Sequence, residues 1–174
     1  MIRTATAQDA GTLAAIAAAT FPLACPPHTS QASIDDFIAT HLTEKHFDAY
    51  LADPSRLLLI AEPEGVPSGY TMLVFAEPSD PDVVAALTLR PTVELSKCYV
   101  LSGAHGSGLA TALMTATVEA ARERGAAGIW LGVNNENAKA NRFYEKHGFE
   151  RVGEKRFLVG DRFEDDFVRE RALR

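Results

Sequence analysis

The chain has 174 residues, of which 47% are hydrophobic and 23% are charged, and its formal net charge at pH 7 is −6. These values are ordinary for a globular protein, and we expect residues 1–174 to form a single domain. Nucleic-acid binding depends on clusters of lysine and arginine, so the acidic balance argues against a nucleic-acid partner. It fits a cationic substrate better.

The cysteines and the apolar runs bear on the cellular compartment. Cys25 and Cys98 are too few for a disulfide-stapled scaffold, and neither belongs to a CxxC pair. No apolar run has the length that crosses a bilayer, and the first residues lack the apolar segment of a signal peptide. We therefore expect a cytoplasmic protein with reduced thiols and no membrane partner.

The first half of the chain is predicted to hold short strands, helices and a hairpin. Residues 1–5 form the first strand. Thr6 caps a helix that ends before Pro22, because proline lacks the N–H that continues a helix. The other elements expected here are a helix from about residue 30, a shorter helix from Thr43 to Leu51, strands at 56–61 and 69–75 that form an antiparallel hairpin, and a surface excursion with little regular structure at 77–90.

The second half is predicted to hold a crossover unit followed by two more strands. Its elements are a strand at 92–101, a helix at 107–124, a buried strand at 129–133, a helix at 137–147, and strands at 150–159 and 163–171. An antiparallel first half followed by a strand–helix–strand crossover predicts an α/β domain with a mixed sheet.

A glycine-containing loop joins the strand at 92–101 to the next helix. It reads His105-Gly106-Ser107-Gly108-Leu109-Ala110. Glycines let the backbone approach a phosphate closely, and the first turn of the following helix offers unpaired N–H donors. The loop is not a Walker motif, because Leu109 follows Gly108, and its GxxGxG spacing is not the Rossmann fingerprint. The sequence therefore predicts a cradle for a diphosphate.

This loop and a later segment resemble the acetyl-CoA-binding core of the Gcn5-related N-acetyltransferases (GNAT superfamily). The loop matches the family's Gln/Arg-x-x-Gly-x-Gly/Ala pattern, and Asn137-Ala138, Tyr144 and Gly148-Phe149 match its later Asn…Ala…Tyr…Gly-Phe pattern. The likeness is close over about 92–171. It implies a mixed, mostly antiparallel central sheet flanked by helices and splayed at the acetyl-CoA site, with acetyl-CoA as co-substrate and no metal.

The resemblance also implies which residues hold acetyl-CoA. They are Tyr99, Val100, Leu101, His105, Gly106, Ser107, Gly108, Leu109, Ala110, Asn134, Asn137, Asn141 and Tyr144. His105 departs from the family's Gln or Arg, which would weaken binding or make it sensitive to pH, unless this side chain merely faces solvent. A free backbone N–H near Leu101 is expected to stabilise the oxyanion. Arg142 and Lys146 either reach the ribose 3′-phosphate or are solvated helix charges.

Two residues are predicted to be catalytic. The family's tyrosine lies beside the CoA sulfur, so Tyr144 is expected to protonate the leaving thiolate, although a packed aromatic would satisfy the same position. Glu94 is expected to be a base that acts through a water, on the face of its strand that also carries Ser96 and Cys98; a surface carboxylate is the alternative. Cys98 itself is expected to be a buried thiol.

Three acidic side chains, Asp35, Asp36 and Glu44, are candidates to line an acceptor cleft, although capping and solvation explain them equally well. The Asp165-Asp166 pair is expected at an edge or turn.

The resulting functional hypothesis is an N-acetyltransferase that moves acetyl from acetyl-CoA to a primary amine by direct attack in a ternary complex. The acidic balance, and a resemblance of residues 21–29 and the two following helices to polyamine-acetylating members, favour a small cationic or polyamine-like acceptor. The alternatives are a protein N-terminal or lysine acetyltransferase and a catalytically weak acyl-CoA-binding sensor. Analogy with the fold favours a homodimer.

Overall fold

One seven-stranded sheet organises the computed structural model, which describes residues 1–174. The strands occur in the order β1-β2-β3-β4-β5-β7-β6. They are β1 (Ile2–Thr4), β2 (Arg56–Ala61), β3 (Gly69–Val74), β4 (Thr92–Val100), β5 (Gly128–Asn134), β6 (Glu150–Val159) and β7 (Arg162–Ala172). The α-helices are α1 (Ala10–Ala24), α2 (Gln31–His41), α3 (Glu44–Ala52), α4 (Pro81–Ala86), α5 (Leu109–Glu123) and α6 (Ala138–Lys146).

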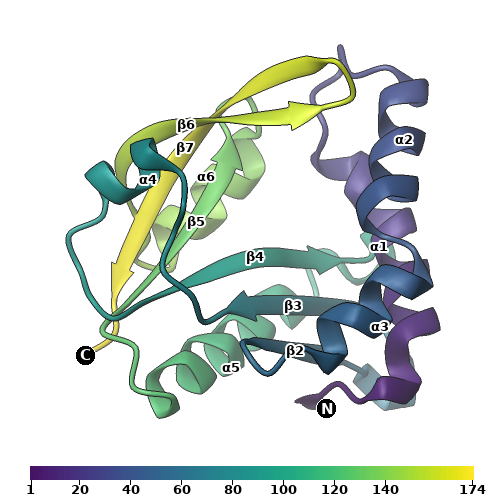
Figure 1. The fold of residues 1–174 in the computed structure, drawn as a ribbon. Coiled ribbons are helices and arrows are strands. Elements are labelled where there is room, and N and C mark those ends of the chain that lie inside the picture. Colours follow the sequence, from purple (N-terminus) through teal and green to yellow (C-terminus); the bar gives the residue numbers. More distant parts are fainter.

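The sheet splits between β4 and β5. These two strands are parallel and pair only where Thr92–Glu94 meets Gly128–Trp130, whereas every other neighbouring pair is antiparallel. Beyond that short ladder the strands diverge, with β2, β3 and β4 in one fan and β5, β7 and β6 in the other (Figure 1). The predicted fold class, a mixed and mostly antiparallel sheet flanked by helices, is confirmed.

A β-bulge in β4 decides which side chains face the split. Leu73 pairs with Leu95 and Met72 with Lys97, so Ser96 is an extra residue on β4. A bulge shifts the alternation of side chains by one and bends the strand. Glu94 therefore shares a face with Lys97, and the sequence-based assignment of Glu94 to the face of Cys98 was wrong.

Helices cover both fans of the sheet. α1, α2 and α3 bury one face of β2–β4 around Leu13, Phe47 and Tyr70, and α5 buries the other face around Leu113 and Met114. In the second fan, α4 covers one face of β5 and β7, and α6 covers the opposite face. None of the helices combines the length and the apolar character needed to span a membrane.

The β6–β7 hairpin reaches across the split to the first helices (Figure 1). Its tip at Gly160 lies against Ser33 of α2. Near the tip, the Phe157 ring packs on Phe37 with centroids 5.6 Å apart, and Val159 joins the core cluster of α1–α3. The two fans are therefore bridged at this side.

The first helix does not end where its sequence predicted. α1 continues through Pro22 to Ala24, because proline in the last turn removes only one backbone hydrogen bond while Phe21 stacks on Phe37 at 4.3 Å.

The predicted excursion at 77–90 also contains a helix. Asp80 caps α4 by accepting a hydrogen bond from the Asp82 N–H, and the buried Val83 packs against Trp130 and Val168.

Candidate active site

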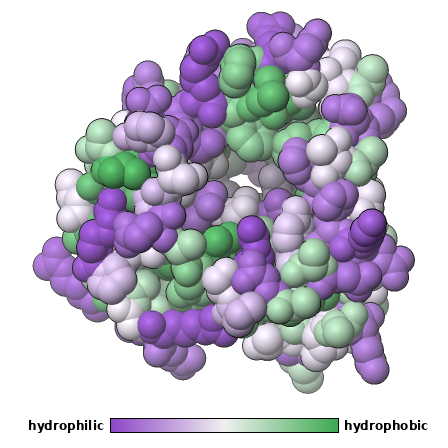
Figure 2. Space-filling model, viewed as in Figure 1, coloured by the Kyte–Doolittle hydropathy of each residue, from purple (hydrophilic) through white to green (hydrophobic).

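A cavity of about 780 Å³ occupies the split between β4 and β5. Figure 2 shows the hollow near the middle of this face of the molecule. Most of the predicted site residues line it: Glu94, Tyr99, Val100, His105, Gly106, Gly108, Ala110, Asn134, Asn137 and Tyr144. Four predicted residues do not line it, namely Leu101, Ser107, Leu109 and Asn141.

The glycine loop offers backbone donors without acceptors. Gly106 and Gly108 have φ angles of 79° and 84°, which glycine adopts without strain, and the space where a Cβ would stand is open at both. The N–H groups of Gly106, Gly108, Ala110 and Thr111 have no acceptor in the protein. Unpaired donors at the start of α5 form a site for an anion, and a diphosphate fits this cradle.

His105 is exposed, but its ring also makes two hydrogen bonds within the protein. Its Nε2–H donates to the Val100 carbonyl oxygen at 2.9 Å, and the Lys139 ammonium donates to its Nδ1 at 3.0 Å. The ring therefore joins the end of β4 to α6, on the opposite fan. Lys139, which also lines the cavity, was not predicted because only the tertiary structure brings it beside the loop.

The three asparagines of the β5–α6 region that were predicted to hold the cofactor, Asn134, Asn137 and Asn141, differ in their surroundings. Asn137 caps α6 by accepting from the Ala140 N–H at 3.1 Å. The Asn141 side chain donates to the carbonyl oxygens of Asn134 and Asn137 and accepts from Arg169 Nε at 3.0 Å. Asn141 thus fixes the turn that positions its two neighbours, and it does not line the cavity, so its role as a cofactor-contacting residue stays a prediction.

The cavity receives the predicted acid, Tyr144, from α6. Burial, followed by the neighbouring Cys98 thiol and Tyr99 phenol, raises the pKa of the Tyr144 phenol well above its ordinary value. The phenol is therefore protonated at neutral pH. Burial also raises the pKa of the Cys98 thiol to about 12, so this cysteine is not a thiolate nucleophile.

The backbone N–H of Leu101 itself is not free to stabilise an oxyanion. Leu101 N–H donates to the Ser68 carbonyl oxygen at 2.8 Å. Consecutive residues of a strand direct their N–H groups to opposite edges, so the N–H of Val100 points toward the split. The N–H of Val100 is thus the candidate for the donor expected near Leu101.

Glu94 is half-buried on the cavity wall. Burial raises the pKa of its carboxyl, against the opposing charges of Lys155, Lys97 and Arg56. A carboxyl with a raised pKa has more of the proton affinity that a base requires.

A second carboxyl in the cavity belongs to Asp166. Since β7 lies between β5 and β6, this residue is not at a sheet edge, contrary to the sequence-based expectation, whereas its neighbour Asp165 is exposed. Asp166 lies 3.6 Å from the Lys155 ammonium. Burial raises the pKa of Asp166 to about 6, although Lys155 acts in the opposite direction.

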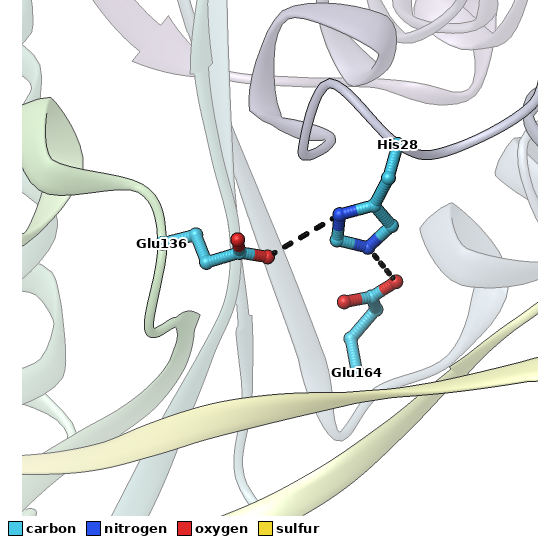
Figure 3. Close-up of side chains that lie close together, drawn as sticks. All are labelled: His28, Glu136 and Glu164. Atoms are coloured by element: carbon cyan, nitrogen blue, oxygen red, sulfur yellow. Dashed lines mark hydrogen bonds and ion pairs between the residues drawn. The ribbon is translucent and has the colours of Figure 1, made fainter.

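At the rim, His28 lies between two carboxylates (Figure 3). Its Nε2 is 2.7 Å from Glu164 Oε1, and its Nδ1 is 3.5 Å from Glu136 Oε2. The carboxylates occupy opposite nitrogens of one ring, which is the geometry of a hydrogen-bonded clamp and not of three ligands around one ion. The clamp ties the α1–α2 loop to β7 and to the β5–α6 turn.

The acidic residues predicted for an acceptor cleft do not reach the cavity. None of Asp35, Asp36 and Glu44 lines it, and neither Arg142 nor Lys146 does. The helices α2 and α3 contribute Phe37, His41 and Tyr50 instead.

The split sheet, the amide cradle and the tyrosine beside it define an N-acetyltransferase. The chain belongs to the acetyltransferase (GNAT) family, whose family model matches residues 17–149. It is 43% identical over 165 residues to an uncharacterised N-acetyltransferase of Mycobacterium tuberculosis (strain ATCC 25618 / H37Rv), covering 95% of this chain and 98% of that protein. An uncharacterised N-acetyltransferase of Lactobacillus delbrueckii subsp. lactis is 27% identical over 138 residues, covering 79% of this chain and 76% of that protein.

Solved structures share the fold. The PaiA N-acetyltransferase of Thermoplasma acidophilum, in complex with coenzyme A, superimposes with a TM-score of 0.79 at 17% identity over 99% of this chain and 98% of that one. A ribosomal-protein-alanine N-acetyltransferase of Brucella melitensis gives a TM-score of 0.67 at 26% identity, with 99% of both chains covered.

Proposed function

We propose that this enzyme transfers an acetyl group from acetyl-CoA to the primary amine of a small molecule, by direct attack in a ternary complex. The observation that carries the proposal is the meeting, in one cavity, of an unpaired amide cradle, a protonated phenol on Tyr144 and a half-buried carboxyl on Glu94. The cradle would bind the donor, the carboxyl would take a proton from the attacking ammonium, and the phenol would protonate the leaving thiolate.

The cradle would hold the diphosphate of acetyl-CoA through the N–H groups of Gly106, Gly108, Ala110 and Thr111. Lys139, fixed by His105, adds a positive charge beside the same loop. Both features fit the negative charge of the diphosphate.

The reaction forms a C–N bond and breaks the C–S bond of the thioester. Glu94 accepts, through a water, the proton that the ammonium loses, and the N–H of Val100 stabilises the oxyanion. Tyr144 donates its proton to the departing thiolate, which is thereby released as a thiol, and the second proton lost by the attacking nitrogen restores the phenol.

For the acceptor, we propose that an ammonium group is drawn to the acidic side of the cavity, formed by Glu94, Glu164 and Asp166. This supports the cationic acceptor expected from the sequence, of which a polyamine is one example. A protein N-terminus or lysine is the alternative acceptor, and a catalytically weak acyl-CoA sensor is the alternative function.

The test is a CoA-release assay with acetyl-CoA over a panel of primary amines. We expect release with at least one small amine, and a fall of about 10²-fold in kcat for Tyr144→Phe with little change in the Kd of acetyl-CoA. Tyr70→Phe is the matched control. The Tyr70 hydroxyl lies outside the cavity, where it is buried and has no hydrogen-bond partner. Saturable acetyl-CoA binding without release on any amine would establish the sensor instead, and unchanged turnover of Tyr144→Phe would remove this phenol from the mechanism.

A further inference from the structure

Lys97 projects from the bulged segment of β4 into the acceptor side of the cavity. Its side chain is half-buried, yet its ammonium has no hydrogen-bond or ion-pair partner in the protein. A partly desolvated charge without a partner is costly, so proteins rarely keep one unless a bound ligand supplies the opposite charge.

The groups around Lys97 do not include an ion-pair or hydrogen-bond partner for its ammonium. Its ammonium lies 5.6 Å from the centre of the Tyr50 ring, and the Arg56 guanidinium lies 4.9 Å from the same ring. Arg56 is itself paired with Asp53 at 3.1 Å. Burial lowers the pKa of Lys97 to about 8, with Glu94 opposing this shift and Arg56 adding to it.

The walls of the acceptor side therefore differ in charge. One wall, from α2, α3 and the end of the bulge, presents His41, Tyr50 and Lys97. The other presents the carboxyls of Asp166 and Glu164, and Glu94 is close enough to interact with both Lys97 and Lys155. In the second wall, Asp166 lies 3.6 Å from the Lys155 ammonium and Glu164 lies 2.7 Å from His28 Nε2, whereas no carboxylate lies within ion-pair distance of Lys97.

We propose that Lys97 is an anion subsite and that the acceptor is a primary amine that also carries a carboxylate, as an amino acid does. This inference rests on the proposed function and narrows its substrate class. The ammonium of such an acceptor faces the acidic wall while its carboxylate accepts hydrogen bonds from Lys97. A single negative charge suits the subsite, because Glu94 is near enough to repel a doubly charged group.

The alternative role for Lys97 is to adjust the pKa of Glu94, since its charge lowers that pKa. The two roles predict different effects of a Lys97 substitution on different acceptors. An effect through Glu94 changes the rate for every amine alike and shifts the pH profile. An anion subsite affects only acceptors that carry the carboxylate.

The experiment compares matched acceptors that differ only in the carboxylate: ornithine with putrescine, arginine with agmatine, and phenylalanine with phenethylamine. We expect the wild type to have a higher kcat/KM for the carboxylated member of at least one pair. Lys97→Met should reduce that ratio about ten- to a hundredfold, mostly through KM. Lys97→Arg, which keeps the charge, should retain most of the preference, and Lys45→Met, on the exposed face of α3, should leave it unchanged.

Calorimetric titration of the CoA-bound protein with the same pairs gives a readout that needs no turnover. If no amine releases CoA but Lys97→Met abolishes binding of a carboxylated amine, the proposed function fails and the anion subsite stands. If amines are acetylated with equal ratios in wild type and Lys97→Met, or no carboxylated amine binds, the subsite is overturned and the proposed function is untouched.

Discussion

At the scale of single residues, the burial of Glu94 makes a pH-dependent prediction. A base works only when deprotonated, so the rate should fall as pH falls through the raised pKa of Glu94. We expect Glu94→Gln to lower kcat/KM about 10²-fold and to abolish this acidic limb. A pH–rate profile from mildly acidic to alkaline pH measures both effects. Glu44→Gln, outside the cavity, is the control, and a Glu94→Gln profile that keeps the wild-type acidic limb would contradict the assignment.

Residues in local motifs were predictable, and residues that depend on the sheet were not. Tyr144 and the glycine loop belong to contiguous patterns, and the cavity contains both. Lys97 and Asp166 reach it because of a one-residue bulge and a strand order that no local pattern encodes. The same bulge explains why Glu94 was placed on the wrong face.

At the scale of elements, the start of α5 depends on glycine. Gly108 has a φ of 84°, and Gly125, beyond the other end of α5, has a φ of 82°. Alanine should strain both positions equally, but only at Gly108 does the new methyl group stand in the cradle. We expect Gly108→Ala to raise the Kd of CoA about tenfold or more, measured calorimetrically, and Gly125→Ala to leave it unchanged. Equal effects of the two variants would show that strain alone weakens binding.

The bounds of most elements were predictable to within two residues, because their hydrophobic periods and caps are local. Two helices, α1 and α4, differed from their predictions because of contacts with segments distant in the sequence. The stacking of Phe21 on Phe37 carries α1 past Pro22, and the burial of Val83 against Trp130 holds α4 where prolines indicated a loop. In both, packing between distant segments outweighs the local signal.

At the scale of the whole molecule, a charge network fastens the N-terminal edge of the sheet. Arg3 donates to Asp9 and Glu62, and the hydrogen bond from Arg3 is the main reason that the pKa of Asp9 falls to about 2. A lowered carboxyl pKa stabilises the fold above its unfolded value of 3.8, and this contribution is lost as pH falls toward 2.

We therefore expect Asp9→Asn to lower Tm by about 2–4 °C at neutral pH. The difference from the wild type should shrink as the pH drops below 3.8, which thermal unfolding followed by circular dichroism would measure. Asp48→Asn, at an exposed position, is the control. A difference that stays constant with pH would mean that the network is not its source.

The contact of the β6–β7 hairpin with α2 limits how an acceptor can enter the cavity. Phe37 and Phe157 line the cavity from opposite fans while packing on each other, so they roof one side of it. A trough would let a polypeptide lie across the reaction centre, but a roofed passage admits a molecule by its end. Short amines and chain termini can enter such a covered cavity readily. A lysine in the middle of a folded protein surface would enter it only from a long, protruding loop.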